Sequence, residues 1–179
     1  MVFSNFQNEK VFTFSEETEM SSEIKPRSFN ILLFGPGNAG KTTYMNKVTS
    51  GQFTNQCGGP LKWKVPLKTN CGTVEFTVTE SCICSFNEEE RYDGYLFMFS
   101  LEEKLPELDF LIEIKNPVII LGNKYDSRRS ECDLSNWAVR NTMSRFSFFQ
   151  VSAKSGYQVG KPFLSLLEEL IEEDVHIIT

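Results

Sequence analysis

Histidine is almost absent from this sequence of 179 residues, and the one present, His176, stands near its end. No C-x-x-C pair occurs either, so a zinc site built from cysteine and histidine ligands is disfavoured. Cys82 and Cys84 would lie on one side of a strand, but two sulfur ligands alone do not make such a site. The five cysteines are an odd number without a secretory pattern, which favours free thiols in a reducing compartment.

Basic residues are outnumbered by acidic ones and do not cluster. The net charge is −6 and the longest basic run is Arg128-Arg129, so binding to a nucleic-acid backbone is disfavoured. Long apolar runs are lacking too. The longest, Tyr95–Leu101 and Val118–Leu121, fall far short of the roughly 18 residues of a membrane-spanning helix. We therefore expect neither nucleic acid nor a membrane among the partners of this chain.

The two ends of the chain lack the common targeting signals. The first residues do not form a signal peptide, and Val2 stands where N-myristoylation requires glycine. Residues 175–179 contain no cysteine for prenylation. The sequence therefore predicts a soluble chain without a lipid anchor.

The composition is that of a globular protein. Apolar residues make up 40% of the chain and charged residues 23%, and the 16 phenylalanines can fill a core. Residues 1–25 are polar, which predicts a flexible extension. Residues 26–179 have the length of one domain.

Two stretches alternate between apolar and polar residues. Residues 62–68 alternate in this way, and so do residues 73–79, after a turn that contains Gly72. Runs of period two around such a turn predict an antiparallel hairpin. The lysines of the first run and its Pro66 indicate a strand at the edge of a sheet.

The rest of the pattern alternates apolar strands with helices. The further predicted strands are residues 29–34, 94–100, 118–121 and 148–151. The predicted helices are residues 41–49, 105–112 and 163–171, and one that begins after Asp133. The fold class is therefore α/β: a mostly parallel six-stranded sheet with one antiparallel hairpin strand and helices on both faces. Ligands of such sheets bind at the carboxyl ends of the strands.

The most specific motif follows the first of these strands. Residues 35–42 have the phosphate-binding form G-x-x-x-x-G-K-[ST] between a strand and a helix. Backbone N–H groups of the loop cradle the α- and β-phosphates, Lys41 reaches the β- and γ-phosphates, and the Thr42 hydroxyl ligates Mg²⁺. The residues expected at the phosphates are Gly35, Gly37, Asn38, Ala39, Gly40, Lys41, Thr42 and Thr43.

Two further motifs stand at the carboxyl ends of predicted strands. They read Gly-Asn-Lys-Tyr-Asp (122–126) and Ser-Ala-Lys (152–154). The Asp126 carboxylate can accept from the ring N1–H and the 2-amino group of guanine, a donor pair that adenine lacks. The N–H of Ala153 can bond the 6-oxo group, and the stem of Lys124 can lie over the base. The residues expected at the base are Asn123, Lys124, Asp126, Ser152, Ala153 and Lys154.

Together and in this order, the three motifs resemble the signature of the Ras-like small GTPases. Within that superfamily, residues 68–78, 122–126 and 151–164 are most similar to the Ran family, the GTPases of nuclear transport. The resemblance covers about residues 28–179, and Phe53 matches the aromatic residue that packs edge-on against guanine. It implies a P-loop G domain that binds GTP or GDP with Mg²⁺. It also implies a monomer of the nucleus and cytoplasm whose partners are nuclear transport receptors or an exchange factor.

The second switch of that family is degraded here. Where the family has Asp-x-x-Gly-Gln, the chain reads Glu-Ser-Cys-Ile-Cys (80–84). Glu80 can still hold a Mg²⁺-bound water, so Thr42 and Glu80 are the metal candidates. Ile83 replaces the glycine whose N–H senses the γ-phosphate. Cys84 replaces the glutamine that orients the attacking water, which a thiol does poorly, so no catalytic residue is assigned.

The first switch is incomplete as well. The nearest counterpart of its Mg²⁺-binding threonine is Cys57, in a shortened segment, and neutral sulfur is a poor ligand for Mg²⁺. The acidic C-terminal tail of the Ran family is also missing from the sequence. We therefore expect a guanine-nucleotide-binding protein with very slow or no GTP hydrolysis, which acts by binding Ran-type partners.

Two alternatives remain open at this point. The chain could be a functional GTPase switch that uses an unorthodox catalytic group, for example within Glu88–Glu90. A P-loop nucleotide or nucleoside kinase is the other, but it would not explain residues 123–126 together with residues 152–154.

Overall fold

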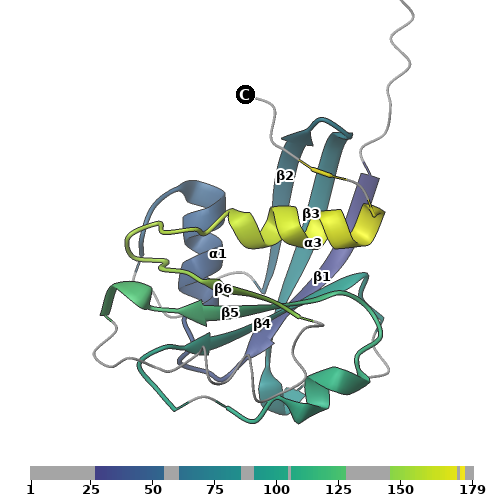
Figure 1. The fold of residues 1–179 in the computed structure, drawn as a ribbon. Coiled ribbons are helices and arrows are strands. Elements are labelled where there is room, and N and C mark those ends of the chain that lie inside the picture. Colours follow the sequence, from purple (N-terminus) through teal and green to yellow (C-terminus); the bar gives the residue numbers. More distant parts are fainter. Residues whose placement is uncertain are drawn as a thin grey trace, which may run out of the picture.

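A six-stranded sheet, in the order β2-β3-β1-β4-β5-β6, forms the centre of the fold in the computed structural model (Figure 1). The structure describes residues 27–54, 61–85, 91–104, 106–127, 146–172 and 174–175. The strands are β1 Arg27–Gly35, β2 Lys62–Thr69, β3 Gly72–Cys82, β4 Gly94–Ser100, β5 Val118–Asn123 and β6 Ser147–Gln150. The α-helices are α1 Lys41–Ser50 and α3 Lys161–Ile171, and the 3₁₀ helices are η1 Ile83–Ser85, η2 Asp109–Glu113 and η3 Tyr125–Ser127.

The sheet is parallel except for β2, which pairs antiparallel with β3. Their register places Trp63 opposite Val78 and Leu67 opposite Val74, so the apolar sides of both strands face the same core. The predicted hairpin is confirmed. The edge position of β2 is confirmed as well, and its lysines and Pro66 suit a strand that pairs on one side only.

One face of the sheet packs against α1 and α3. Tyr44 of α1 stacks on Phe163 of α3 with ring centroids 6.3 Å apart, and Phe163 contacts Phe76 of β3 at 5.8 Å. All three rings are fully buried. The Tyr44 hydroxyl donates to the backbone oxygen of Val159 at 2.7 Å, which ties α1 to the segment before α3. The predicted helices at residues 41–49 and 163–171 are therefore confirmed, in contact with each other's side chains.

The opposite face carries a second core, built on Phe34 of β1 and Phe97 of β4, whose rings meet edge to face at 5.2 Å. Leu108 and Leu111, around η2, cover it together with Phe110. Within the described residues, only 3₁₀ helices and loops lie on this face. α-Helices on both faces are thus not seen there, and the helix expected after Asp133 falls outside the described residues.

The helix predicted over residues 105–112 is wrong in type and extent. The described part of this segment contains only η2, and Ile112 is 49% exposed although its spacing placed it on the apolar side. Pro106 is the second residue of the segment and Pro117 follows its end, and the residue before a proline is disfavoured in the helical region. Only a few helical turns fit between the two prolines, and so short a helix does not offset the cost of its nucleation.

Several predictions from the sequence concern residues that the structure does not describe. These are the extension at residues 1–25, Cys57, residues 88–90, Arg128-Arg129 and His176. Among the helices that the structure does describe, none is long and apolar enough to cross a membrane.

The close approach of β1 to β4 makes glycine necessary at the last position of β1. Gly35 has φ +148°, and a Cβ atom there would lie 1.9 Å from the backbone oxygen of Met98. A Cβ atom at Gly37, two residues later, would have no neighbouring atom within 4 Å. The two glycines of one loop therefore differ in their steric constraint.

Gly35→Ala should lower the free energy of unfolding by about 3 kcal/mol or more, because the strand must shift away from β4. Gly37→Ala is the matched control and should change it by less than about 0.5 kcal/mol. Urea denaturation of both variants without added nucleotide measures the difference. Equal losses would contradict the close contact at Met98.

Candidate functional site

The phosphate loop runs from the end of β1 to the first turn of α1 and closes around the side chain of Lys41. The Lys41 Nζ donates to the backbone oxygens of Gly35 at 3.0 Å and Pro36 at 2.9 Å. Lys41 is only 4% exposed, and burial lowers the pKa of its ammonium, while the nearby Glu80 carboxylate opposes that shift. The loop thus holds a cation beneath its backbone, as phosphate binding requires.

Gly40 stands at the turn into α1 with φ +85° and ψ +30°, in the left-handed region. A Cβ atom there would lie 2.7 Å from the Asn123 Nδ2. Glycine at this position therefore lets the loop contact the end of β5. The N–H groups of the first turn of α1 face the same region, and a helix N-terminus favours an anion.

Thr42 and Glu80 meet where α1 begins and β3 ends. The Thr42 hydroxyl lies 2.9 Å from both carboxylate oxygens of Glu80 and donates to them. The structure thus brings the two metal candidates together. Hydroxyl and carboxylate oxygens suit Mg²⁺, which commonly takes one or two protein ligands and completes its shell with water and phosphate oxygens. The pair fits Mg²⁺ carried by a nucleotide rather than a metal site made by protein alone. Among the described residues, no group of three or more acidic, cysteine or histidine side chains forms a metal site.

Asn123, at the end of β5, joins the phosphate loop to the loop after β6. Its Nδ2 donates to the Ala39 backbone oxygen at 2.9 Å, and its Oδ1 accepts from the Ala153 N–H at 3.2 Å. The side chain is 2% exposed. Asn123 therefore positions two loops, and its amide is engaged by protein groups on both sides. The Ala153 N–H, which we expected to bond the 6-oxo group of a base, is already donated to Asn123.

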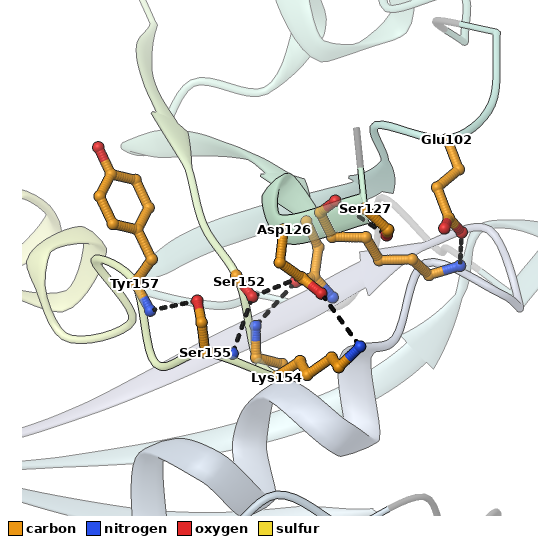
Figure 2. Close-up of polar contacts among 10 residues, drawn as sticks. Glu102, Asp126, Ser127, Ser152, Lys154, Ser155 and Tyr157 are labelled. Atoms are coloured by element: carbon orange, nitrogen blue, oxygen red, sulfur yellow. Dashed lines mark hydrogen bonds and ion pairs between the residues drawn. The ribbon is translucent and has the colours of Figure 1, made fainter. Parts of the chain in front are cut away.

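The Asp126 carboxylate is held in a fixed position in η3 (Figure 2). Its Oδ1 accepts from the Ser152 hydroxyl at 2.5 Å, and its Oδ2 lies 3.7 Å from the Lys154 Nζ. Ser152 in turn accepts from the N–H of Ser155 at 3.0 Å. Ser152 is fully buried whereas Asp126 keeps 21% of its side chain exposed. Ser152 thus supports the carboxylate from within, and Lys154, which is mostly exposed, contributes a weak ion pair from outside.

An aromatic pair stabilises the same corner. The rings of Tyr125 and Tyr157 stack with centroids 4.9 Å apart and an interplanar angle of 20°. A backbone hydrogen bond also joins Tyr157 to the second motif, because the N–H of Ser152 donates to the Tyr157 backbone oxygen at 3.1 Å. The motifs that end at Asp126 and begin at Ser152 are therefore packed as one unit.

Two acidic residues that belong to none of the sequence motifs also reach the site. Glu102 accepts from the Lys124 Nζ at 3.0 Å, and Glu103 accepts from the Asn38 side-chain amide of the phosphate loop. Both follow the carboxyl end of β4 directly, at the edge where the other site residues gather. Their position after a buried strand was the one feature of the sequence that could have indicated them as site residues.

A cavity of about 340 Å³ opens between these loops, within the usual size range of ligand pockets. It is lined by Gly40, Thr43, Phe53, Glu102, Asn123, Lys124, Asp126, Ser127, Ala153 and Lys154. Eight of these ten are residues predicted to contact a nucleotide, and Glu102 and Ser127 are the additions. Phe53 is 39% exposed on the wall. Lys41 and Thr42 do not line this cavity and stand on the phosphate-loop side of it.

Cys84, which stands where the resemblance to small GTPases leads us to expect a glutamine, lies in η1, immediately after β3. It is exposed, and its Sγ donates to the Cys82 Sγ at 2.9 Å. The hydrogen bonds from Cys84 lower the pKa of the Cys82 thiol, and the charge of Lys41 adds to the effect. Ile83, between them, packs against the second core on the far side of the sheet. Cys84 thus has a neighbouring sulfur as its partner, and the residue before it is anchored.

No protein-family model matches the chain.

Asn123→Ala should lower the free energy of unfolding by about 2–5 kcal/mol, because it leaves two buried backbone groups without a partner. Asn116→Ala is the control, since the Asn116 amide makes one exposed hydrogen bond, to the Tyr92 backbone oxygen at 2.6 Å. That change should cost about 0.5–1.5 kcal/mol. Urea denaturation without nucleotide checks both values. A loss at Asn123 no larger than that at Asn116 would contradict the bridging role.

Proposed function

We propose that this chain binds a guanine nucleotide between the phosphate loop and the Asp126 carboxylate, as a divergent Ran-like member of the Ras-like small GTPases. The single observation that carries the proposal is the fixed carboxylate at the cavity wall. Asp126 is aligned by the buried Ser152, and it lines the same cavity as Gly40, at the turn into α1. The cavity therefore reaches from the turn into α1, near which we place the phosphates, to the carboxylate against which we place the base.

Asp126 gives this site its selectivity for guanine. Each carboxylate oxygen has two lone-pair positions, so the bond from Ser152 leaves both oxygens able to accept. Guanine offers the N1–H and the 2-amino group to them, whereas adenine offers no such pair. Leaving a partly buried carboxylate without these donors costs about 1–3 kcal/mol per missing bond, so ATP binds far more weakly.

The remaining base contacts come from the cavity wall. Phe53 supplies an aromatic ring, and the Lys124 stem is held by the bond between its ammonium and Glu102. The Ala153 N–H makes a long bond of 3.2 Å to Asn123, and such an N–H can be shared with a second acceptor, here the 6-oxo group.

The phosphates lie against the loop and the N-terminus of α1. The Lys41 ammonium donates to the β- and γ-phosphates, either in place of its hydrogen bonds to the two backbone oxygens or in addition to them. Thr42 and Glu80 are the residues that would hold Mg²⁺. The ion, when bound with the nucleotide, neutralises charge on the phosphates.

Hydrolysis is very slow or absent in this proposal. Cys84 offers a thiol that is hydrogen-bonded to the Cys82 sulfur, whereas orienting water requires a group such as an amide. Ile83 is anchored in the second core, which opposes movement of its N–H toward a γ-phosphate. The protein then acts by occupying Ran-type partners, namely nuclear transport receptors or an exchange factor, in the nucleus and cytoplasm. Its rival remains a working GTPase switch with another catalytic group, and turnover separates the two.

Purified wild-type protein should bind GDP and GTP but not ATP, by titration with fluorescent nucleotides. Asp126→Asn should prefer xanthine nucleotides, because the new amide donates to the 2-oxo group while its oxygen still accepts from Ser152. Lys41→Ala is the control that should lose nucleotide binding. The wild type should gain about 2.7 kcal/mol of stability at a nucleotide concentration 100 times Kd, and this variant almost none. Equal affinity of the wild type for ATP and GTP would overturn the assignment.

Single-turnover hydrolysis of bound GTP should proceed at or below about 10⁻⁴ s⁻¹. The affinities for GDP and GTP should agree within about tenfold, since few contacts distinguish a γ-phosphate. Cys84→Gln alone should not restore turnover, because Ile83 stays anchored. Fast wild-type turnover would favour the rival GTPase switch.

A further inference from the structure

Two cysteines stand together at the point where β3 ends and η1 begins. The Cys84 Sγ and the Cys82 Sγ are 2.9 Å apart, and both thiols are free. Cys84 is exposed and Cys82 is half-buried, so a small reagent reaches the pair from solvent. The contact exists because the chain turns here. In a continuous strand the same two residues would be about 6.6 Å apart along the chain.

A sulfur–sulfur distance of 2.9 Å is close to bonding distance. A disulfide bond measures about 2.05 Å, so the two atoms need to approach by less than about 1 Å. Ile83, the residue between the two cysteines, is held in place because it packs against the second core. The fold therefore supplies most of the orientation that ring closure requires.

The pair suits a disulfide better than a metal. A zinc site takes four ligands, usually with further sulfur or imidazole donors. The described residues contain no group of three such donors, here or elsewhere. With two thiols in contact and no third ligand, reversible oxidation is the chemistry that remains.

We propose that Cys82 and Cys84 form a reversible intramolecular disulfide by exchange with a small disulfide such as oxidised glutathione. The exposed Cys84, as thiolate, attacks one sulfur of glutathione disulfide, which breaks that bond and releases one glutathione thiolate. Cys82, as thiolate, then attacks the Cys84 sulfur of the mixed disulfide and releases the second glutathione. In balance, two protein thiols are oxidised by two electrons, one glutathione disulfide is reduced, and the two protons go to the two glutathione thiolates.

The pair adjoins the phosphate side of the site, because Glu80, which carries the bonds from Thr42, is two residues before Cys82. The inference does not depend on nucleotide binding. A mass measurement on the protein reports it even if the proposed function fails.

The test uses the full chain with Cys71→Ser, because trypsin then releases a peptide, residues 69–91, that holds only Cys82 and Cys84 as thiols. Equilibration with glutathione buffers of increasing oxidation, followed by acid quenching and digestion, should show this peptide losing two hydrogen masses. Reduction with a dithiol should restore it. The same titration in denaturant gives the reference for the unstructured chain.

In the native protein, the equilibrium constant for disulfide formation should exceed the denatured value by about tenfold or more, because the fold holds the sulfurs in contact. Two further variants, C84S and C82S in the Cys71→Ser chain, should yield only glutathione adducts. The proposal is overturned if the native peptide with both cysteines carries glutathione adducts or stays reduced throughout. Equal constants in native and denatured protein would overturn it too.

Discussion

The buried amide of Asn123 holds together the two loops on which the candidate site depends. It bonds Ala39 in the phosphate loop and Ala153 in the loop after β6, and it lies at the end of a strand buried along its whole length. Gly40 permits this contact, since any side chain there would strike the Asn123 amide. The side chain of this one residue thus sets the spacing of the two loops at the cavity. Its short amide suits this position because it offers both a donor and an acceptor.

Acidic groups surround the site closely, yet the described ones are paired within the protein. Glu80 accepts from Thr42, Glu102 from Lys124, Glu103 from Asn38, and Asp126 from Ser152. These bonds orient the carboxylates. They also place negative charge near the loop that carries the phosphate-binding motif. A nucleotide bound here, as we propose, would need its cation to offset this negative charge, and Thr42 and Glu80 offer the hard oxygens that suit such a cation.

Local pattern was sufficient for most of the fold. The alternation in residues 62–68 and 73–79 predicted the hairpin, and the lysines with Pro66 predicted its edge position. The helix predicted over residues 105–112 was wrong because the spacing of a few apolar residues around Pro106 does not distinguish an α-helix from a turn of 3₁₀ helix. Glu102 and Glu103 were missed because no motif contains them. Their contacts appear only once β4 lies between β1, whose loop contains Asn38, and β5, which Lys124 follows.

By itself, the sequence determined the strands, the phosphate loop and the residues that line much of the cavity. Hydrophobic periodicity and the placement of glycine are local signals, which can be read within a few neighbouring residues. Only the tertiary structure decided that the Asn123 amide bridges two loops and that the Ala153 N–H already donates to it. It also decided that Cys84 meets Cys82 instead of standing alone. Asn123 and Ala39 are 84 positions apart in the chain. The partner of a buried polar group is fixed by which strands pair and by desolvation, and these are properties of the folded chain.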